Sequence, residues 1–183
     1  MHYGFDPDRL LLDKIVLNKI DAARMQLESA VKMFFFEWDA VSKHTLVGAA
    51  HGIVHDLARK RGIEGSLKDS PLIRPEERKE FVAAVNAPQN YFEHADREDA
   101  ETQATFYYNV TRFYLFDAIL LFVKLGGAVT YTLKIFLLWF QLRYPDLLQY
   151  EPAEETLRRI RDDAAADPEA IARALLQEPE ANP

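Results

Sequence analysis

Polar side chains of several chemical kinds are concentrated in residues 90–97. This segment reads Asn-Tyr-Phe-Glu-His-Ala-Asp-Arg and combines an amide, two carboxylates, an imidazole and a guanidinium. His94 would titrate near neutral pH and could act as a general acid or base, with Glu93 or Asp96 tuning it. Arg97 could hold an anion, and Asn90 an anionic or amide group. The alternative is a helix-ending turn whose polar side chains satisfy unpaired backbone groups.

Asp117 stands within an almost entirely apolar stretch, residues 113–122. A buried carboxylate without a partner costs several kcal/mol or takes up a proton. We therefore expect Asp117 to pair with one of the available cationic groups: His44, His51, His94, Arg97 or Arg112. Such a pair could simply fix how two helices align. It could also orient a histidine that belongs to a binding or catalytic site.

One face of the predicted helix 40–61 carries four residues at steps of four, three and four: His44, Gly48, His51 and His55. His51 and His55 have the spacing of a zinc-binding pair, and His94 and Asp96 could supply further ligands. The glutamate of the His-Glu-x-x-His pattern is missing, because Gly52 follows His51. Packed or solvated histidines are the competing explanation, and we predict no cofactor and no bound metal.

Two groups of aromatic residues could stack on nucleic-acid bases: the run Phe34-Phe35-Phe36 and the pair Tyr107-Tyr108. Lysine and arginine do not alternate with these rings, so we expect both groups to lie in the core. Three consecutive phenylalanines cannot all face one side of a helix. One of the three should therefore be exposed, at a contact between subunits.

Composition excludes several classes of function. The chain has no cysteine, which rules out disulfides and thiolate chemistry and suits a cytoplasmic protein. Of the net charge of −7, the segment from Glu151 onward carries nine acids and four arginines, so residues 1–150 are nearly neutral. This distribution argues against nucleic acid as a partner. Charged residues divide the most apolar region, so no run reaches the ~20 residues that span a bilayer.

Apolar residues at three- and four-residue steps predict an all-α fold. The first stripe includes Trp38, and Pro88 should end or kink the fourth helix. Further helices should begin at 6–7, 151–152 and 167–168. The predicted core helices are 18–38, 40–61, 75–88, 109–125 and 130–144. We expect a single-domain bundle of about five core helices in residues 1–150, an acidic tail with two peripheral helices in 151–183, and a homodimer.

The helix with His44-Thr45-Leu46 and Ala49-Ala50-His51, followed by residues 90–97, resembles a family of uncharacterised bacterial all-helical proteins. The resemblance spans roughly residues 18–150 and implies a shared fold and a shared polar segment. A remoter similarity is to HEPN domains, small helical domains of toxin and defence RNases, in which an Arg precedes a His by four to six residues. Here Arg97 follows His94, so only these two positions carry over.

These observations predict a cytosolic small-ligand or regulatory binding module that takes a small anionic ligand. Its polar pocket would be built from residues of three segments: His44, His51, Asn90, His94, Asp96, Arg97 and Asp117. The second hypothesis is an enzyme, either a HEPN-like ribonuclease with His94 as acid or base, or a metal-assisted hydrolase with a metal on His51, His55 and His94. The third is a structural or interaction protein whose polar residues only hold helices together.

Overall fold

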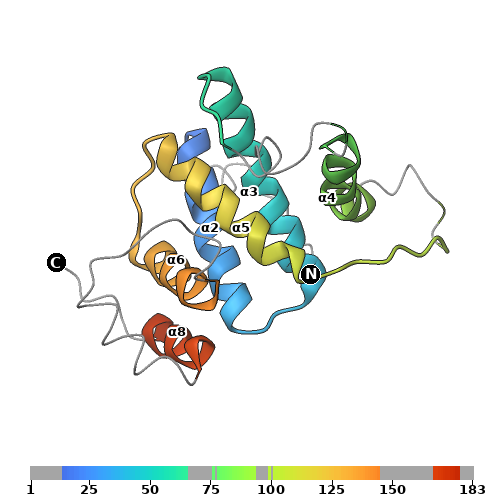
Figure 1. Cartoon of the computed structure of the whole chain (residues 1–183). Helices are drawn as coiled ribbons and strands as arrows, with labels where there is room; N and C mark the ends of the chain where they lie inside the picture. The colour runs from blue at the N-terminus through green and yellow to red at the C-terminus, as the bar shows by residue number, and fades with distance from the viewer. Residues whose placement is uncertain are drawn as a thin grey trace, which may run out of the picture.

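The computed structural model describes residues 14–65, 76, 78–93, 99, 101–144 and 167–177 of the chain. All the regular structure in these residues is helical, as the sequence predicts. Figure 1 shows the helices gathered into a bundle, with α4 standing at one side. Six helices are described: α2 (Lys19–Phe35), α3 (Ala40–Lys60), α4 (Arg78–Glu93), α5 (Val110–Lys124), α6 (Tyr131–Arg143) and α8 (Pro168–Gln177).

Helices α2 and α3 form an antiparallel pair with capped starts. The Asn18 side chain accepts a hydrogen bond from the Asp21 backbone N–H, and Asp39 accepts one from Ser42 at the start of α3. Between them Glu37 has a left-handed φ of 56°, which reverses the chain. The prediction that the first helix includes Trp38 is therefore wrong, because α2 ends three residues before Trp38 and the indole is exposed.

Helices α3 and α5 run side by side in the same direction. His44 near the start of α3 contacts Thr111 near the start of α5, and Arg61 after α3 donates to the backbone oxygen of Leu125 after α5. Helices α5 and α6 are apolar nearly all round, as expected for central elements. Their buried side chains meet those of α2 and α3 in one core, of which the largest members are Trp139, Tyr114, Phe35, Phe122, Phe136 and Phe140.

Helix α4 continues past the point where the sequence predicts its end. Pro88 lies inside the helix, and residues 90–93 form the last turn rather than a loop between helices. A proline removes one helical hydrogen bond and crowds the preceding turn, so this continuation must be supported by packing. The side chains of Gln89 and Phe92 provide it, since they lie against Gly48 and His44 of α3.

The C-terminal helix α8 packs on the bundle. It begins at Asp167-Pro168 as predicted, and Asp167 accepts a hydrogen bond from the Ala170 backbone N–H. Ala172 is buried against the core, and α8 contacts α6 and α2. The helix starts predicted at 6–7 and 151–152 lie outside the described residues.

The two aromatic groups differ in placement. Phe35 is buried and Phe36 is exposed, which confirms that the three phenylalanines do not share one side. Tyr107 and Tyr108 are both strongly exposed, so the prediction of a core position for this pair is wrong. The segment before α5 is irregular, and no helical periodicity turns these rings inward. In the described part of the chain, every helix is too short or too polar to cross a membrane.

Candidate functional site

The centre of the site is a hydrogen bond between His51 of α3 and Asp117 of α5. Nε2 of His51 lies 2.7 Å from Oδ2 of Asp117, and both side chains are almost completely buried. This confirms that the carboxylate within the apolar helix meets an imidazole from the histidine-bearing helix. An ionised carboxylate can only accept, so Nε2 of His51 carries the proton in this hydrogen bond.

Two further rings are stacked on the His51 imidazole. Tyr114 lies one turn before Asp117 on α5, and its ring is nearly parallel to that of His51 at a centroid distance of 4.2 Å. His55 lies one turn after His51 on α3, with ring centroids 5.6 Å apart, and is half-buried. Burial and the neighbouring charge of Asp117 raise the pKa of the Tyr114 hydroxyl, which therefore stays protonated and can donate a hydrogen bond.

His44 is equally buried and lies one helical turn before Gly48, on the same face of α3. Its Nδ1 shares a hydrogen bond of 3.1 Å with the hydroxyl of Thr111, and its Nε2 has no hydrogen-bond partner among the described residues. The rings of Phe92, Phe106 and Tyr114 surround it at 4.8–6.1 Å. Burial lowers the pKa of His44 to about 4, so this imidazole is neutral at physiological pH.

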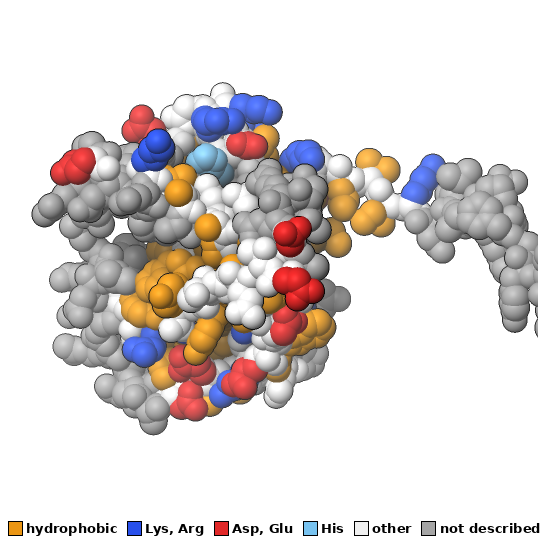
Figure 2. Space-filling view, turned by 90° about the vertical axis from the view of Figure 1, so that its right-hand side faces the viewer, with side chains coloured by type: hydrophobic (Ala, Val, Ile, Leu, Met, Phe, Trp, Pro, Cys, Tyr) orange, Lys and Arg blue, Asp and Glu red, His pale blue; other side chains and the backbone are white. Residues whose placement is uncertain are grey.

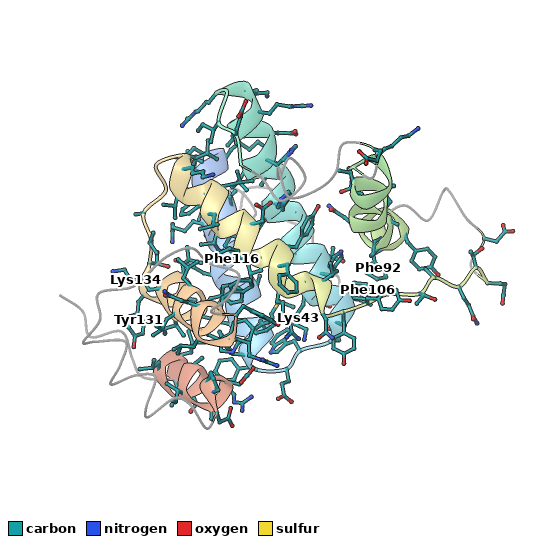
Figure 3. All side chains as sticks on the ribbon, viewed as in Figure 1. Lys43, Phe92, Phe106, Phe116, Tyr131 and Lys134 are labelled. Carbon is teal, nitrogen blue, oxygen red and sulfur yellow. The ribbon has the colours of Figure 1, made fainter. Side chains whose placement is uncertain are left out.

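Helix α4 covers these histidines with polar and aromatic side chains. Asn86 accepts a hydrogen bond of 3.3 Å from the Tyr114 hydroxyl. The carboxamide of Gln89 lies against Gly48, at 2.6–2.9 Å from the point where a Cβ would stand. Only glycine leaves room for this contact. Phe92 stands beside Phe106, as the labelled side chains in Figure 3 show, and closes the layer near His44.

We call this set the polar layer, since its members lie at the seam of α3, α5 and α4: His44, His51, Asn86, Gln89, Thr111, Tyr114 and Asp117. Three of the residues predicted from the sequence belong to it, namely His44, His51 and Asp117. Asn90 lies instead on the exposed face of α4. Arg112 is engaged elsewhere, with the Tyr144 hydroxyl and the Asn109 side chain. His94, Asp96 and Arg97 lie outside the described residues.

Four members of the polar layer are absent from the site predicted by the sequence: Asn86, Gln89, Thr111 and Tyr114. A signal for two of them was present, because Thr111, Tyr114 and Asp117 follow one another at three-residue steps in an otherwise apolar helix. That spacing matches the face formed by His44, Gly48 and His51. The α4 residues carry no comparable signal, since their role depends on how α4 docks.

A metal centre has little support in the described ranges. No group of three or more His, Asp or Glu side chains in them could hold a metal ion. His51 and His55 stack ring on ring, and Nε2 of His51 is engaged by Asp117. Of the ligand set predicted for a metal, His94 lies outside the described residues.

Comparisons with known proteins found no relative of this chain. No protein-family model matches the sequence, and neither a curated protein nor a solved structure matches it significantly. The geometry of the polar layer therefore carries the functional argument.

Proposed function

We propose that the protein is a cytosolic small-ligand-binding module whose site is the polar layer, with α4 as its cover. The observation that carries the proposal is the buried hydrogen bond between His51 and Asp117, which Tyr114 connects to α4 by stacking on His51 and bonding to Asn86. Apolar residues of similar volume often stabilise a helix seam as well as or better than a buried charged pair. A seam serving only stability has no need of two buried histidines and a carboxylate.

The attachment of α4 supports its role as a cover. Among the described helices, α4 packs mainly on α3, and Figure 1 shows it apart from α2, α6 and α8. Helices with few packed neighbours open at lower free-energy cost than the core. Movement of α4 would withdraw Asn86 and Gln89 together and uncover His44 and His51.

The contact of Gln89 with Gly48 indicates the chemical class of the ligand. A planar carboxamide rests on bare backbone between the two buried histidines. A ligand carrying a carboxamide or a carboxylate has the same planar shape and could take this place when α4 moves. Such a group can accept hydrogen bonds from the Tyr114 hydroxyl and from Nε2 of His44 when that nitrogen carries the proton of the neutral ring. Arg97 and Asp96, which follow α4 in the sequence, remain predicted contacts for an anionic ligand.

The proposal is tested by thermal unfolding with acetate, acetamide and inorganic phosphate as separate probes. We expect acetate or acetamide to raise the Tm saturably, and His51→Gln to abolish the rise. Gln89→Ala should strengthen it, because the competing carboxamide is gone. Gly52→Ala, on the exposed side of α3, is the control and should leave it unchanged. Absence of any shift, or a shift that survives His51→Gln, would show that the polar layer is purely structural.

One observation favours an enzyme as the second candidate. The carboxylate of Asp117 holds one nitrogen of His51, which is how a general acid–base histidine is oriented in many active sites. In a HEPN-like ribonuclease, His94 would share this role. RNA cleavage by the purified protein that is lost in both His51→Gln and His94→Ala would support this candidate. Cleavage that persists in His94→Ala would eliminate the HEPN-like version.

A further inference from the structure

Exposed aromatic side chains gather at the end of the bundle where α3 and α5 begin. Tyr107 and Tyr108 lie between Phe106 and Thr111, both of which contact His44 of α3. Trp38 and Val41 precede His44 at the start of the same helix. We call these four residues the aromatic end: Trp38, Val41, Tyr107 and Tyr108, which are 59%, 46%, 78% and 63% exposed. Large apolar side chains exposed together at one end of a protein indicate a contact with another protein.

A second apolar surface lies in the chain before α2. Residues 14–18 form no helix, Asn18 has an extended backbone, and the three apolar side chains among these residues are exposed: Ile15 by 72%, Val16 by 92% and Leu17 by 44%. We call residues 14–18 the arm. In Figure 2 it leaves the body on the right as a narrow stalk bearing orange hydrophobic side chains. Consecutive extended residues point to opposite sides, so a partner must enclose the arm to bury all three.

The arm and the aromatic end lie at opposite ends of the molecule. Helices α2 and α3 are antiparallel, so the start of α2 is far from the start of α3. The 17 residues of α2 span ~25 Å at 1.5 Å per residue. Leu17, Val16 and Ile15 are one to three residues before Asn18, which caps the start of α2, and three extended residues reach only ~10 Å. The arm of one chain therefore cannot cover the aromatic end of that same chain.

A second copy in the antiparallel orientation removes this restriction. A two-fold axis across the bundle places the arm of each copy beside the aromatic end of the other, so both apolar surfaces of both copies become buried at once. This is the closed, reciprocal arrangement typical of two-fold dimers. Any other end-to-end arrangement of two copies would leave one arm and one aromatic end uncovered.

Charge also matches the two surfaces. The arm is bracketed by Lys14 and Lys19, with no acid between them. Trp38 is followed by Asp39, and the hydrogen bond from the Ser42 backbone holds the pKa of Asp39 below its usual value. Asp39 is therefore ionised under all ordinary conditions. Glu37, on the other side of Trp38, already pairs with Arg173 of α8. Lys43, four residues after Asp39 on the first turn of α3, partly offsets the negative charge there, so the attraction for the lysines of the arm is centred on Asp39.

We propose that two copies of this chain form a two-fold dimer by exchanging arms, each arm binding the partner's aromatic end. In this dimer the aliphatic side chains of the arm lie on Trp38, Tyr107 and Tyr108 of the other copy. The exchange is independent of the polar layer, which faces α4.

The absence of cysteine from the chain allows a sharp test by disulfide crosslinking. Val16→Cys and Tyr107→Cys proteins, one carrying a size tag, are mixed and mildly oxidised. We expect the mixed disulfide to exceed both self-disulfides by several-fold. Val123→Cys replaces Tyr107→Cys in the control mixture, since Val123 is exposed on α5 away from the aromatic end. Equal yields with Val123→Cys, or an intrachain bond in the double variant at high dilution, would overturn the exchange.

Light scattering provides the second readout. The unmodified chain should have the mass of a dimer, and Tyr107→Ser with Tyr108→Ser should shift it to the monomer with unchanged helicity. Met25→Ser changes an exposed apolar residue of α2 and should leave the dimer intact. A monomeric unmodified chain, or a dimer that survives the double tyrosine substitution, would contradict the proposal.

Discussion

His51 and Asp117 join α3 to α5 by a hydrogen bond of 2.7 Å, although neither side chain has appreciable access to water. The two residues are 66 positions apart, so the pair forms only when the two helices are packed in parallel and in the correct register. Tyr114 lies flat on the imidazole and prevents the ring from turning. The pair therefore fixes both the alignment of the helices and the orientation of the histidine.

Removal of one partner should be strongly destabilising. Asp117→Ala or His51→Ala leaves the other polar group buried, and we expect each to lower the free energy of unfolding by about 3–5 kcal/mol. The double variant His51→Leu with Asp117→Leu should lose much less, because no unpaired group remains. Urea denaturation measures all three. A cost below ~1 kcal/mol for Asp117→Ala would mean that the pair is not buried in solution.

His44 should make stability depend on pH. Its folded-state pKa of about 4 lies below the ordinary value of 6.5 because the ring is buried, so the unfolded chain binds the proton more readily. The contribution is fully present above pH 6.5 and is lost as the pH falls toward about 4. Denaturation at several pH values should show a shallower loss over this window in His44→Asn. His55→Gln, changed at a half-buried position, should retain the loss seen in the unmodified chain.

The sequence predicted the centre of the site because one physical cost dominates there. A carboxylate among Phe, Leu and Ile must find a donor, and the face with His44 and His51 was the nearest regular source. The same reasoning did not find Tyr114, whose ring looks like an ordinary core residue in the sequence. Its role follows from stacking on His51, which depends on the register between α3 and α5.

Local rules were less successful where tertiary packing competes with them. The rule that helices end before proline predicted an end at Pro88, but α4 continues because Gln89 and Phe92 pack against α3. As a result Asn90 is in a helix and faces outward, not in a site loop. Tyr107 and Tyr108 were expected in the core because no lysine or arginine alternates with them, and that pattern does not say which side of an irregular segment faces water.

Gly48 should be needed for the closed position of α4. Gly48→Ala would place a Cβ 2.6–2.9 Å from the carboxamide of Gln89, which must then move. Gly52→Ala on the same helix meets no atom within 4 Å and should raise stability by about 0.5–1 kcal/mol. We expect Gly48→Ala to lack this gain and to speed hydrogen exchange in α4. Adding Gln89→Ala to Gly48→Ala should restore the gain in stability. If Gly48→Ala and Gly52→Ala behaved alike, the Gln89 carboxamide would not occupy the space beside Gly48.

Pro88 should keep α4 only marginally stable, which suits a cover that has to move. Pro88→Ala restores a backbone N–H inside the helix. We expect it to raise the free energy of opening of α4 by up to about 3 kcal/mol, which slows hydrogen exchange in this helix. Ala87→Gly at the exposed neighbouring position should lower the free energy of opening of α4 by about 1 kcal/mol and so speed its hydrogen exchange. If the helix ended before Pro88 in solution, neither change would alter exchange in residues 89–93. Because a more rigid α4 opens less often, Pro88→Ala should also weaken the stabilisation by acetate or acetamide.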